Sequence, residues 1–209
     1  RLSVTDRCDL RCTYCMGADI AFAPRSETLN LEELARLARV FIAKGVRKIR
    51  LTGGEPLIRR NVITLLRQLG GLVKSGRLDE LTLTTNGTRL EYWAEDIASA
   101  GIARINVSLD SLNPEIFARI TGRNELPGVL NGLAAARRAG LSVRINTVAQ
   151  RGLNEDGIDD LVAWCGQQGF DLGLIELMPL GADTRAGNDL YLPLGEIRRR
   201  LSSKWGLVP

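Results

Sequence analysis

The sequence contains no histidine, and this absence removes several kinds of active site at once. Ser-His-Asp and Cys-His nucleophilic sites and the HExxH zinc motif all need an imidazole. Hydrolysis by those routes is therefore excluded. A zinc site with three thiolates is ordinarily completed by histidine, so zinc also becomes the weaker interpretation of any cysteine cluster in this chain.

Long apolar runs and a strong charge of one sign are also missing. No run approaches the roughly 18 apolar residues of a membrane span, and no charged-then-apolar leader is present. The formal charge is only +4, from 28 basic and 24 acidic residues, and the basic cluster Arg198–Arg200 is expected on the outer face of a helix. We therefore expect a cytoplasmic protein that binds neither membranes nor nucleic acid.

Three of the four cysteines, Cys8, Cys12 and Cys15, form a C-x₃-C-x₂-C run. Iron–sulfur clusters are usually bound by four thiolates. A compact set of three indicates a cluster with one iron left free for a substrate or cofactor, in a compartment that keeps the thiols reduced. The fourth cysteine, Cys165, lies alone in a helical pattern beside Trp164, where we expect a buried structural thiol.

The run RLSVTDRCDLRCTYCM at residues 1–16 resembles the opening of radical S-adenosylmethionine enzymes, in which an aromatic residue precedes the third cysteine as Tyr14 does. The chain is most similar to the GTP 3′,8-cyclase family of molybdenum cofactor biosynthesis. That resemblance implies a lyase with a 4Fe–4S cluster and S-adenosylmethionine as cofactors. It also implies GTP as the substrate and (8S)-3′,8-cyclo-7,8-dihydroguanosine 5′-triphosphate as the product.

Short β-branched or leucine-rich runs alternate with helical patterns, which indicates an α/β protein built of βαβ units around a parallel sheet. The predicted strands are Leu2–Thr5, Lys48–Thr52, Glu80–Thr85, Arg104–Leu109, Ser142–Val148 and Gly173–Leu177. The predicted helices are Leu31–Ala43, Val62–Ser75, Tyr92–Ala100, Pro114–Ile120, Gly128–Ala139 and Glu155–Gln168.

Polar or glycine-rich residues follow the carboxyl end of all six predicted strands. A site served by every strand end is typical of a barrel mouth, whereas an open sheet serves mainly the strands at its switch point. The expected fold is therefore a partial (β/α)₆ TIM-like barrel of the radical SAM type, which the resemblance also implies. With 209 residues and 44% hydrophobic content, we expect a single domain over residues 1–209.

The loop Gly53-Gly54-Glu55-Pro56 follows the second predicted strand. Its two glycines permit close backbone approach and leave room for a ligand, although glycine and proline also mark ordinary turns. The resemblance implies that such a loop binds the methionine amino group of S-adenosylmethionine. In that case Gly54 makes the backbone contact and Glu55 supports the loop.

The resemblance also implies roles for single residues elsewhere in the chain. The further cofactor contacts that it implies are Tyr14, Ser108 and Met178. The substrate contacts that it implies are Arg1, Arg50, Thr84 and Arg144. Guanidinium groups suit bidentate contact with phosphate, but a surface charge on a strand edge, or a hydroxyl that caps the next helix, is the other interpretation of these positions.

Two departures from the cyclase pattern leave alternatives open. Met16-Gly17 stands where the family commonly has Met-Pro, and no cysteines after Cys165 supply the second cluster of the family. Because the chain starts at Arg1 and stops at Pro209, we expect a segment that lacks the second-cluster region. A radical enzyme acting on a peptide or another small molecule stays open, as does a non-enzymatic module that binds a structural metal. The expected electron donor resembles flavodoxin or ferredoxin, and a homodimer stays open.

Overall fold

The computed structural model describes residues 1–15, 20–178 and 190–206. The chain divides into two compact units. Unit 1 comprises Arg1–Asp9, Ala21–Ser108 and Pro127–Arg144, and unit 2 comprises Leu10–Ile20, Leu109–Leu126 and Ile145–Pro209. The chain passes from the first unit to the second inside the cysteine run, between the first and second cysteines. The expectation of a single domain stays a prediction.

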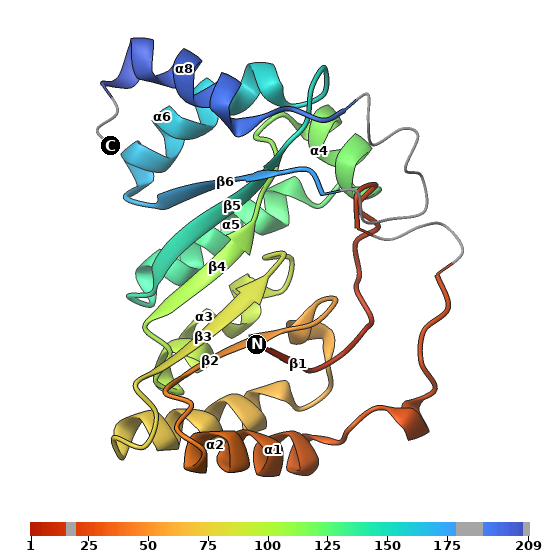
Figure 1. The fold of residues 1–209 in the computed structure, drawn as a ribbon, viewed down its shortest axis with the longest axis vertical. Helices are drawn as coiled ribbons and strands as arrows, with labels where there is room; N and C mark the ends of the chain where they lie inside the picture. Colours follow the sequence, from red (N-terminus) through yellow and green to blue (C-terminus); the bar gives the residue numbers. More distant parts are fainter. Residues whose placement is uncertain (16–19, 179–189, 207–209) are drawn as a thin grey trace. The chain divides into compact units, whose positions relative to one another are not determined.

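Within the described residues, six strands are hydrogen-bonded in the order in which they occur in the chain (Figure 1). They are β1 (Leu2–Ser3), β2 (Lys48–Thr52), β3 (Glu80–Thr85), β4 (Arg104–Ser108), β5 (Ser142–Ala149) and β6 (Asp171–Glu176). The pairs from β1 to β4 are parallel, with Leu51 of β2 beside Leu2 and Leu83. The predicted parallel α/β sheet is confirmed. Strands β2 and β3 have the predicted bounds, and the changed ends of the other four strands differ by one or two residues.

Helices separate the strands, as the alternating pattern predicts. They are α1 (Leu31–Ala43), α2 (Val62–Lys74), α3 (Leu90–Ser99), α4 (Pro114–Thr121), α5 (Leu126–Arg138), α6 (Ile158–Gln168) and α8 (Leu194–Trp205), with 3₁₀ turns η1 (Arg25–Glu27), η2 (Pro56–Ile58) and η3 (Glu155–Gly157). Helix α1 begins at the predicted residue because Asn30 and Glu33 form a reciprocal capping box. The acidic start predicted for α6 is instead the separate turn η3.

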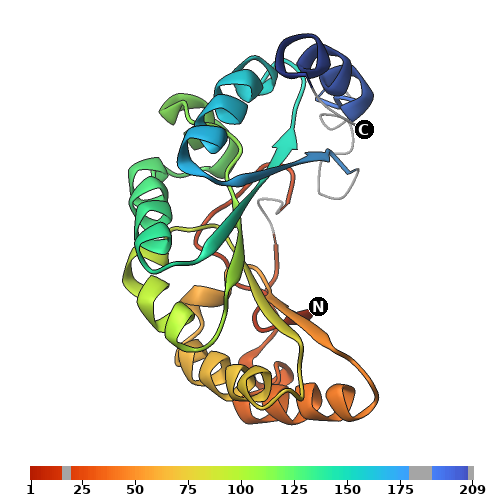
Figure 2. The ribbon, with the colours of Figure 1, turned by 90° about the vertical axis from the view of Figure 1, so that its left-hand side faces the viewer.

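The sheet of unit 1 has one apolar and one polar face. Alternate residues of β2, β3 and β4 are buried and apolar, and the helices of this unit lie along one side of its strands (Figure 2). The intervening residues form what we call the polar face: Arg50, Thr82, Thr84, Asn106 and Ser108. They share that face because Arg50 pairs with Thr82 and Thr84 pairs with Asn106 in the parallel register.

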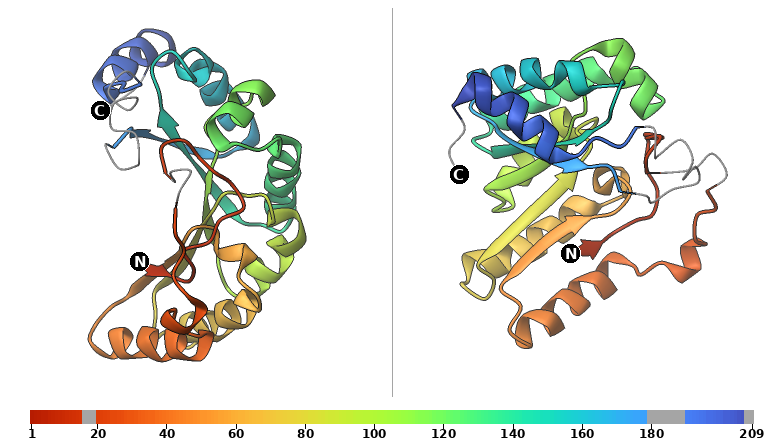
Figure 3. Two further views of the ribbon diagram at one scale, coloured as in Figure 1. Left: turned by 90° about the vertical axis from the view of Figure 1, so that its right-hand side faces the viewer. Right: turned by 45° about the horizontal axis from the view of Figure 1, so that its top comes forward.

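Unit 2 has a core of its own, made by the end of β5 together with α6 and α8. Its fully buried members are Ala149, Ile158, Leu192, Ile197 and Leu201. Helix α8 lies beside α6 (Figure 3), where Asp159 accepts a 3.1 Å hydrogen bond from the indole N–H of Trp205. Across the described residues, every helix is too short or too polar to cross a membrane.

Candidate cluster and cofactor site

The segment that leads to the first cysteine is held by the loop after β2. The N–H of Gly54 donates to the Thr5 carbonyl and that of Glu55 to the Arg7 carbonyl, each at 2.8 Å. A Cβ atom on Gly53 would lie 2.5 Å from the Thr5 oxygen, and one on Gly54 would lie 2.3 Å from the Arg7 oxygen. Both glycines are therefore needed for the close approach of the loop to the chain's own backbone.

Glu55 ties this loop to the end of β3. Its carboxylate is fully buried and accepts hydrogen bonds from the N–H of Leu57 at 2.9 Å, the hydroxyl of Thr85 at 2.8 Å and the N–H of Asn86 at 2.6 Å. These bonds favour the charged form, but burial outweighs them and raises the pKa of Glu55 to about 7. Glu55 is thus a buried link between two loops at the carboxyl ends of neighbouring strands.

Asn86 continues this network to the first cysteine. Its side-chain amide lies 2.7 Å from Oδ1 of Asp9 and 3.7 Å from Sγ of Cys8. Thr88 donates to the other carboxylate oxygen of Asp9 at 2.8 Å. The only signal for Asn86 in the sequence was its place among polar residues at a strand end, so its contact with a cysteine was missed.

The second and third cysteines lie in unit 2, in a tight turn where the N–H of Cys15 donates to the carbonyl of Cys12 at 3.0 Å. Tyr14, between them, donates its hydroxyl proton to Oδ2 of Asp110 at 2.7 Å. Asp110 is buried, and its Oδ1 accepts the N–H of Val148 at 2.8 Å. Sequence reasoning missed Asp110, which stands out only as a polar residue after a predicted strand.

Burial shifts the acid–base properties of this turn. It raises the pKa of Asp110 to about 6, against the hydrogen bonds from Tyr14 and Val148. The pKa of Tyr14 is also raised well above its usual value, first by burial and then by the nearby charge of Asp110. Tyr14 therefore stays a neutral hydrogen-bond donor, which suits an anchor that keeps this part of the cysteine run in place.

The same turn is fixed to the end of α4 by its backbone. The N–H of Arg11 donates to the carbonyl of Thr121 at 2.8 Å, and that of Thr13 donates to the carbonyl of Ile120 at 2.9 Å. These bonds occupy backbone groups on either side of the second cysteine. The turn is thus ordered by main-chain bonds and by the Tyr14 anchor together.

The donor set fits an iron–sulfur cluster. Cys8 and Cys12 are half-buried and Cys15 is exposed, and the sequence has no histidine to compete for metal. In the described part of the chain no three cysteine or acidic side chains are already grouped as a metal site, so ligation by this trio stays a prediction. Cys165 differs because it is buried, as predicted, and burial raises its pKa to about 11.

The other predicted contacts divide between the units. Arg50, Thr84 and Ser108 share the polar face of unit 1, and Arg1 and Arg144 are exposed in the same unit. Met178 follows β6 in unit 2 and is 59% exposed. Met16, Gly17 and Pro179 lie outside the described residues. The structure thus brings three of the predicted contacts onto one face, and their ligands stay predictions.

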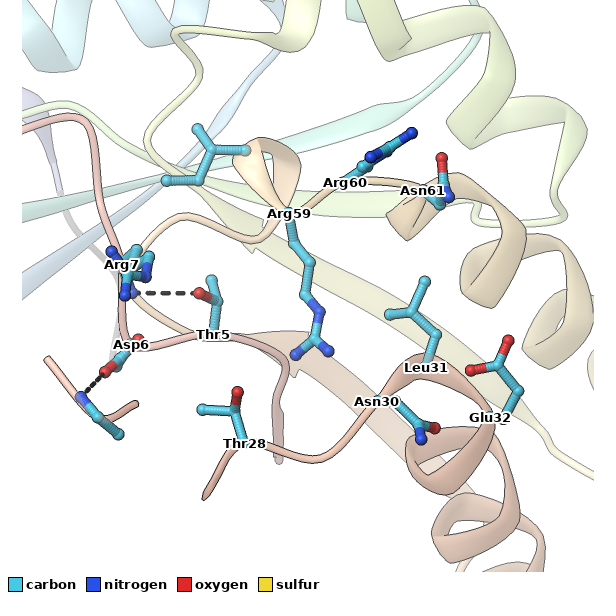
Figure 4. A pocket seen from close by; sticks show the side chains of 12 residues that line it. Thr5, Asp6, Arg7, Thr28, Asn30, Leu31, Glu32, Arg59, Arg60 and Asn61 are labelled. Carbon is cyan, nitrogen blue, oxygen red and sulfur yellow. Dashed lines mark hydrogen bonds between the residues drawn. The ribbon is translucent and has the colours of Figure 1, made fainter. Parts of the chain in front are cut away.

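A cavity of about 550 Å³ opens beside the segment that precedes the first cysteine (Figure 4). Arg59 points into it, and its guanidinium donates to the carbonyls of Val4 and Leu29. Its wall includes Thr5 and Arg7 but none of the residues predicted to contact cofactor or substrate. The cavity therefore differs from the predicted cofactor site.

Sequence comparison places the chain among known proteins. The family model described as the radical SAM superfamily matches residues 2–165. A GTP 3′,8-cyclase of Rhizobium meliloti (strain 1021) is 54% identical over 207 residues, which cover 99% of this chain and 59% of the relative. One of Rhodopseudomonas palustris (strain TIE-1) is 55% identical over 208 residues, 100% and 60% of the two chains. The chain spans about three fifths of the length of these curated relatives.

Solved structures share the fold at low sequence identity. Streptococcus suis SuiB bound to S-adenosylmethionine superposes with a TM-score of 0.75 at 19% identity, over 98% of this chain and 48% of that chain. The protein anSMEcpe with bound AdoMet gives a TM-score of 0.76 at 18% identity, over 97% and 55%. These likenesses confirm the predicted fold class, a partial (β/α)₆ TIM-like barrel. Because the family model covers most of the chain, from β1 through the cysteine run to α6, the chain belongs to the radical SAM superfamily.

Proposed function

We propose that this protein is a GTP 3′,8-cyclase, a lyase that converts GTP to (8S)-3′,8-cyclo-7,8-dihydroguanosine 5′-triphosphate in molybdenum cofactor biosynthesis. The observation that carries the proposal is the identity of 54% and 55% to two proteins of that name along 99% and 100% of this chain. The relatives are longer than the chain, so the complete reaction is part of the proposal.

Membership in the superfamily implies a 4Fe–4S cluster and S-adenosylmethionine as cofactors. When bound, these groups supply a reducing electron and a radical that abstracts hydrogen from the substrate. Cys8, Cys12 and Cys15 would bind three irons and leave the fourth for S-adenosylmethionine. The protein's part is to bind and orient the reactants and to exclude water.

The loop after β2 is suited to receive an amino group. The N–H of Gly54 is already donated to Thr5, so a contact with an amino group uses the carbonyl of Gly54, the acceptor that such a donor needs. Glu55 stabilises the loop through the hydrogen bonds that its buried carboxylate accepts. Tyr14, Ser108 and Met178 are the other cofactor contacts that we propose.

The polar face of unit 1 is suited to a polyanionic substrate. Lys48 and Arg104, at the amino ends of β2 and β4, both form ion pairs with Glu80, at 3.5 Å and 2.8 Å, which offset part of their charge. Within the described part of the chain, no ion pair engages the three arginines proposed for GTP, which are Arg1, Arg50 and Arg144. Their charge is therefore free to attract a triphosphate, and Thr84 offers a hydroxyl on the same face as Arg50.

The test is an anaerobic incubation of the reconstituted full-length protein with GTP, S-adenosylmethionine and dithionite, followed by mass spectrometry; the segment of residues 1–209 alone is not expected to complete the reaction. The expected products are 5′-deoxyadenosine and the cyclised nucleotide. Formation of 5′-deoxyadenosine without any GTP-derived product would contradict the substrate and favour a peptide or another small molecule. A preparation that binds only zinc would instead favour the non-enzymatic module.

An arginine variant separates substrate binding from cofactor cleavage. Arg144→Ala should weaken GTP binding by roughly tenfold or more, the size expected for one lost charge-assisted contact, while GTP-independent cleavage of S-adenosylmethionine persists. Calorimetric titration of GTP and assay of 5′-deoxyadenosine measure the two effects. Unchanged GTP affinity would remove Arg144 from the substrate contacts.

The remaining partners belong to the same proposal. A small reducing protein such as flavodoxin or ferredoxin would supply the electron, and the protein would work in the cytoplasm, where thiolates stay reduced. A homodimer and the absence of nucleic-acid binding stay predictions.

A further inference from the structure

Asn86 contacts both Glu55 of the β2 loop and the first cysteine, all within unit 1. It follows β3, its side chain is buried, and its backbone N–H donates to the Glu55 carboxylate at 2.6 Å. Its side-chain nitrogen faces Cys8 at 3.7 Å and Asp9 at 2.7 Å. Asn86 thus links the buried Glu55 carboxylate to Cys8, which is predicted to bind iron.

The orientation of the Asn86 amide follows from its neighbours. The backbone N–H of Thr88 lies 3.0 Å from the Asn86 oxygen and can only donate, so the atom facing it must be the amide oxygen. The NH₂ group then faces the carboxylate of Asp9 and the sulfur of Cys8. The flipped amide would place an oxygen against two acceptors and an NH₂ group against a donor, which excludes it.

The two N–H bonds of this amide match the two acceptors in front of it. One N–H is used by Asp9 and the other points to Cys8. When Cys8 is bound to iron as a thiolate it has no proton to give to Asp9, whose Oδ1 lies 4.0 Å away. The Asn86 amide then supplies one N–H to the Asp9 carboxylate and the other to the Cys8 sulfur.

We propose that Asn86 is a positioning residue for the cluster, whose amide donates a hydrogen bond to the Cys8 thiolate and so raises the reduction potential. The inference rests on the proposed ligation of iron by Cys8. A hydrogen bond to a ligating sulfur withdraws electron density from it, and such bonds are among the factors that set cluster potentials. Asn86 acts through Cys8 and needs no contact with substrate.

The test compares variants of the reconstituted protein by redox titration followed by EPR spectroscopy. Asn86→Ala removes the amide and keeps the backbone bond to Glu55. Asn86→Asp keeps the shape and the acceptor for Thr88 but replaces the donor. Both variants should bind the cluster, and its reduction potential should be more negative than in the wild-type protein. At a fixed solution potential the ratio of reduced to oxidised cluster should fall roughly tenfold, which corresponds to a shift of about 59 mV for one electron.

Asn154→Ala is the matched control, because Asn154 is also buried and makes three hydrogen bonds, none of them to a cysteine. It should leave the potential unchanged. A potential that stays at the wild-type value in both Asn86 variants, or that shifts as much in Asn154→Ala, would overturn the proposal. If the wild-type protein forms no cyclised nucleotide while both Asn86 variants still show the shift in potential, that result counts against the proposed function alone.

A second measurement decides the matter if the Asn86 variants do not fold. The wild-type protein labelled with ¹⁵N at asparagine is reduced and studied by pulsed EPR. A ¹⁵N coupling to the cluster, absent from protein labelled at glutamine instead, supports the hydrogen bond. No coupling in the asparagine-labelled protein overturns it.

Discussion

The cysteine run is anchored by a different buried carboxylate in each unit. In unit 1, the Glu55 carboxylate accepts three hydrogen bonds and is linked to the first cysteine through the backbone and amide of Asn86. In unit 2, Asp110 binds the hydroxyl of Tyr14 directly, and Tyr14 is the neighbour of the third cysteine. Both carboxylates are buried, and burial raises both pKa values.

This difference shows that the eight residues from Cys8 to Cys15 do not form a self-sufficient loop. The conformation at each end depends on residues of its own unit that are far away in the sequence: the loops after β2 and β3 for the first cysteine, and Asp110 and Val148 for the other two. A substitution at either carboxylate should therefore disturb one end of the run through local hydrogen bonds. The predictions below test the two ends separately.

The largest effect is expected when a thiolate is removed from the unit 2 end. Cys12→Ala should abolish cluster assembly, because two cysteines leave too few thiolates for a 4Fe–4S cluster. Iron and sulfide analysis after anaerobic reconstitution measures it. Cys165→Ala is the control and should keep the cluster, since that thiol is buried in α6. A full complement of iron in Cys12→Ala would contradict the ligand assignment.

Of the two partners in the Tyr14–Asp110 hydrogen bond, Asp110 should contribute more to stability. Asp110→Ala leaves the Tyr14 hydroxyl and the Val148 N–H without an acceptor in a buried place, and we expect a loss of about 3 kcal/mol in the free energy of unfolding. Tyr14→Phe removes one donor and should cost about 1–2 kcal/mol. Urea denaturation measures both, and a Tyr14→Phe variant less stable than Asp110→Ala would contradict the anchor.

The two carboxylates should also differ in the pH range over which they affect stability. Each binds its proton more tightly when folded, so the free energy of unfolding falls as pH rises from the unfolded pKa to the folded pKa. For Glu55 that range is 4.5 to about 7, and for Asp110 it is 3.8 to about 6. No histidine exists to titrate in the same interval.

Between pH 6 and 7 the wild-type protein should therefore lose about 1 kcal/mol of stability, mostly through Glu55. Glu55→Gln should flatten the profile in that interval, whereas Asp110→Asn should flatten it below pH 6. Urea denaturation at half-unit pH steps measures both slopes. Stability that rises between pH 6 and 7 in the wild-type protein would show that the Glu55 carboxyl is not held in its protonated form.

Local sequence patterns were enough to predict most of the helices and strands. Helix α1 was predicted with its observed ends from its helical pattern, and the structure adds the capping box of Asn30 and Glu33 at its start. Strands β2 and β3 were also predicted with their observed ends. The alternation of strand and helix patterns sufficed for the fold class, since parallel strands need crossover connections.

The supporting network could not be predicted in the same way. The bond from Tyr14 to Asp110 joins residues 96 positions apart, and that from Asn86 to Cys8 joins residues 78 apart. Neither pair has a local pattern, because the partners meet only when separate strand ends come together. The glycines of the β2 loop were predicted to permit close backbone approach and to leave room for a ligand. The structure shows a close approach to the chain's own backbone, and the ligand stays a prediction.

The smallest effect is expected at the edge of the unit 1 network. Thr88→Val keeps the volume and the backbone N–H that orients Asn86 but removes the hydroxyl, which lies 2.8 Å from both Oδ2 of Asp9 and the Asn86 amide oxygen. Asp9 keeps its bond from Asn86 and an ion pair with Arg89 at 3.9 Å, so the loss should be about 1 kcal/mol. Thermal unfolding measures it. A cost as large as that of Asp110→Ala would mean that the unit 1 end depends on Asp9 itself more than on Glu55 and Asn86, which would reverse the comparison between the two anchors.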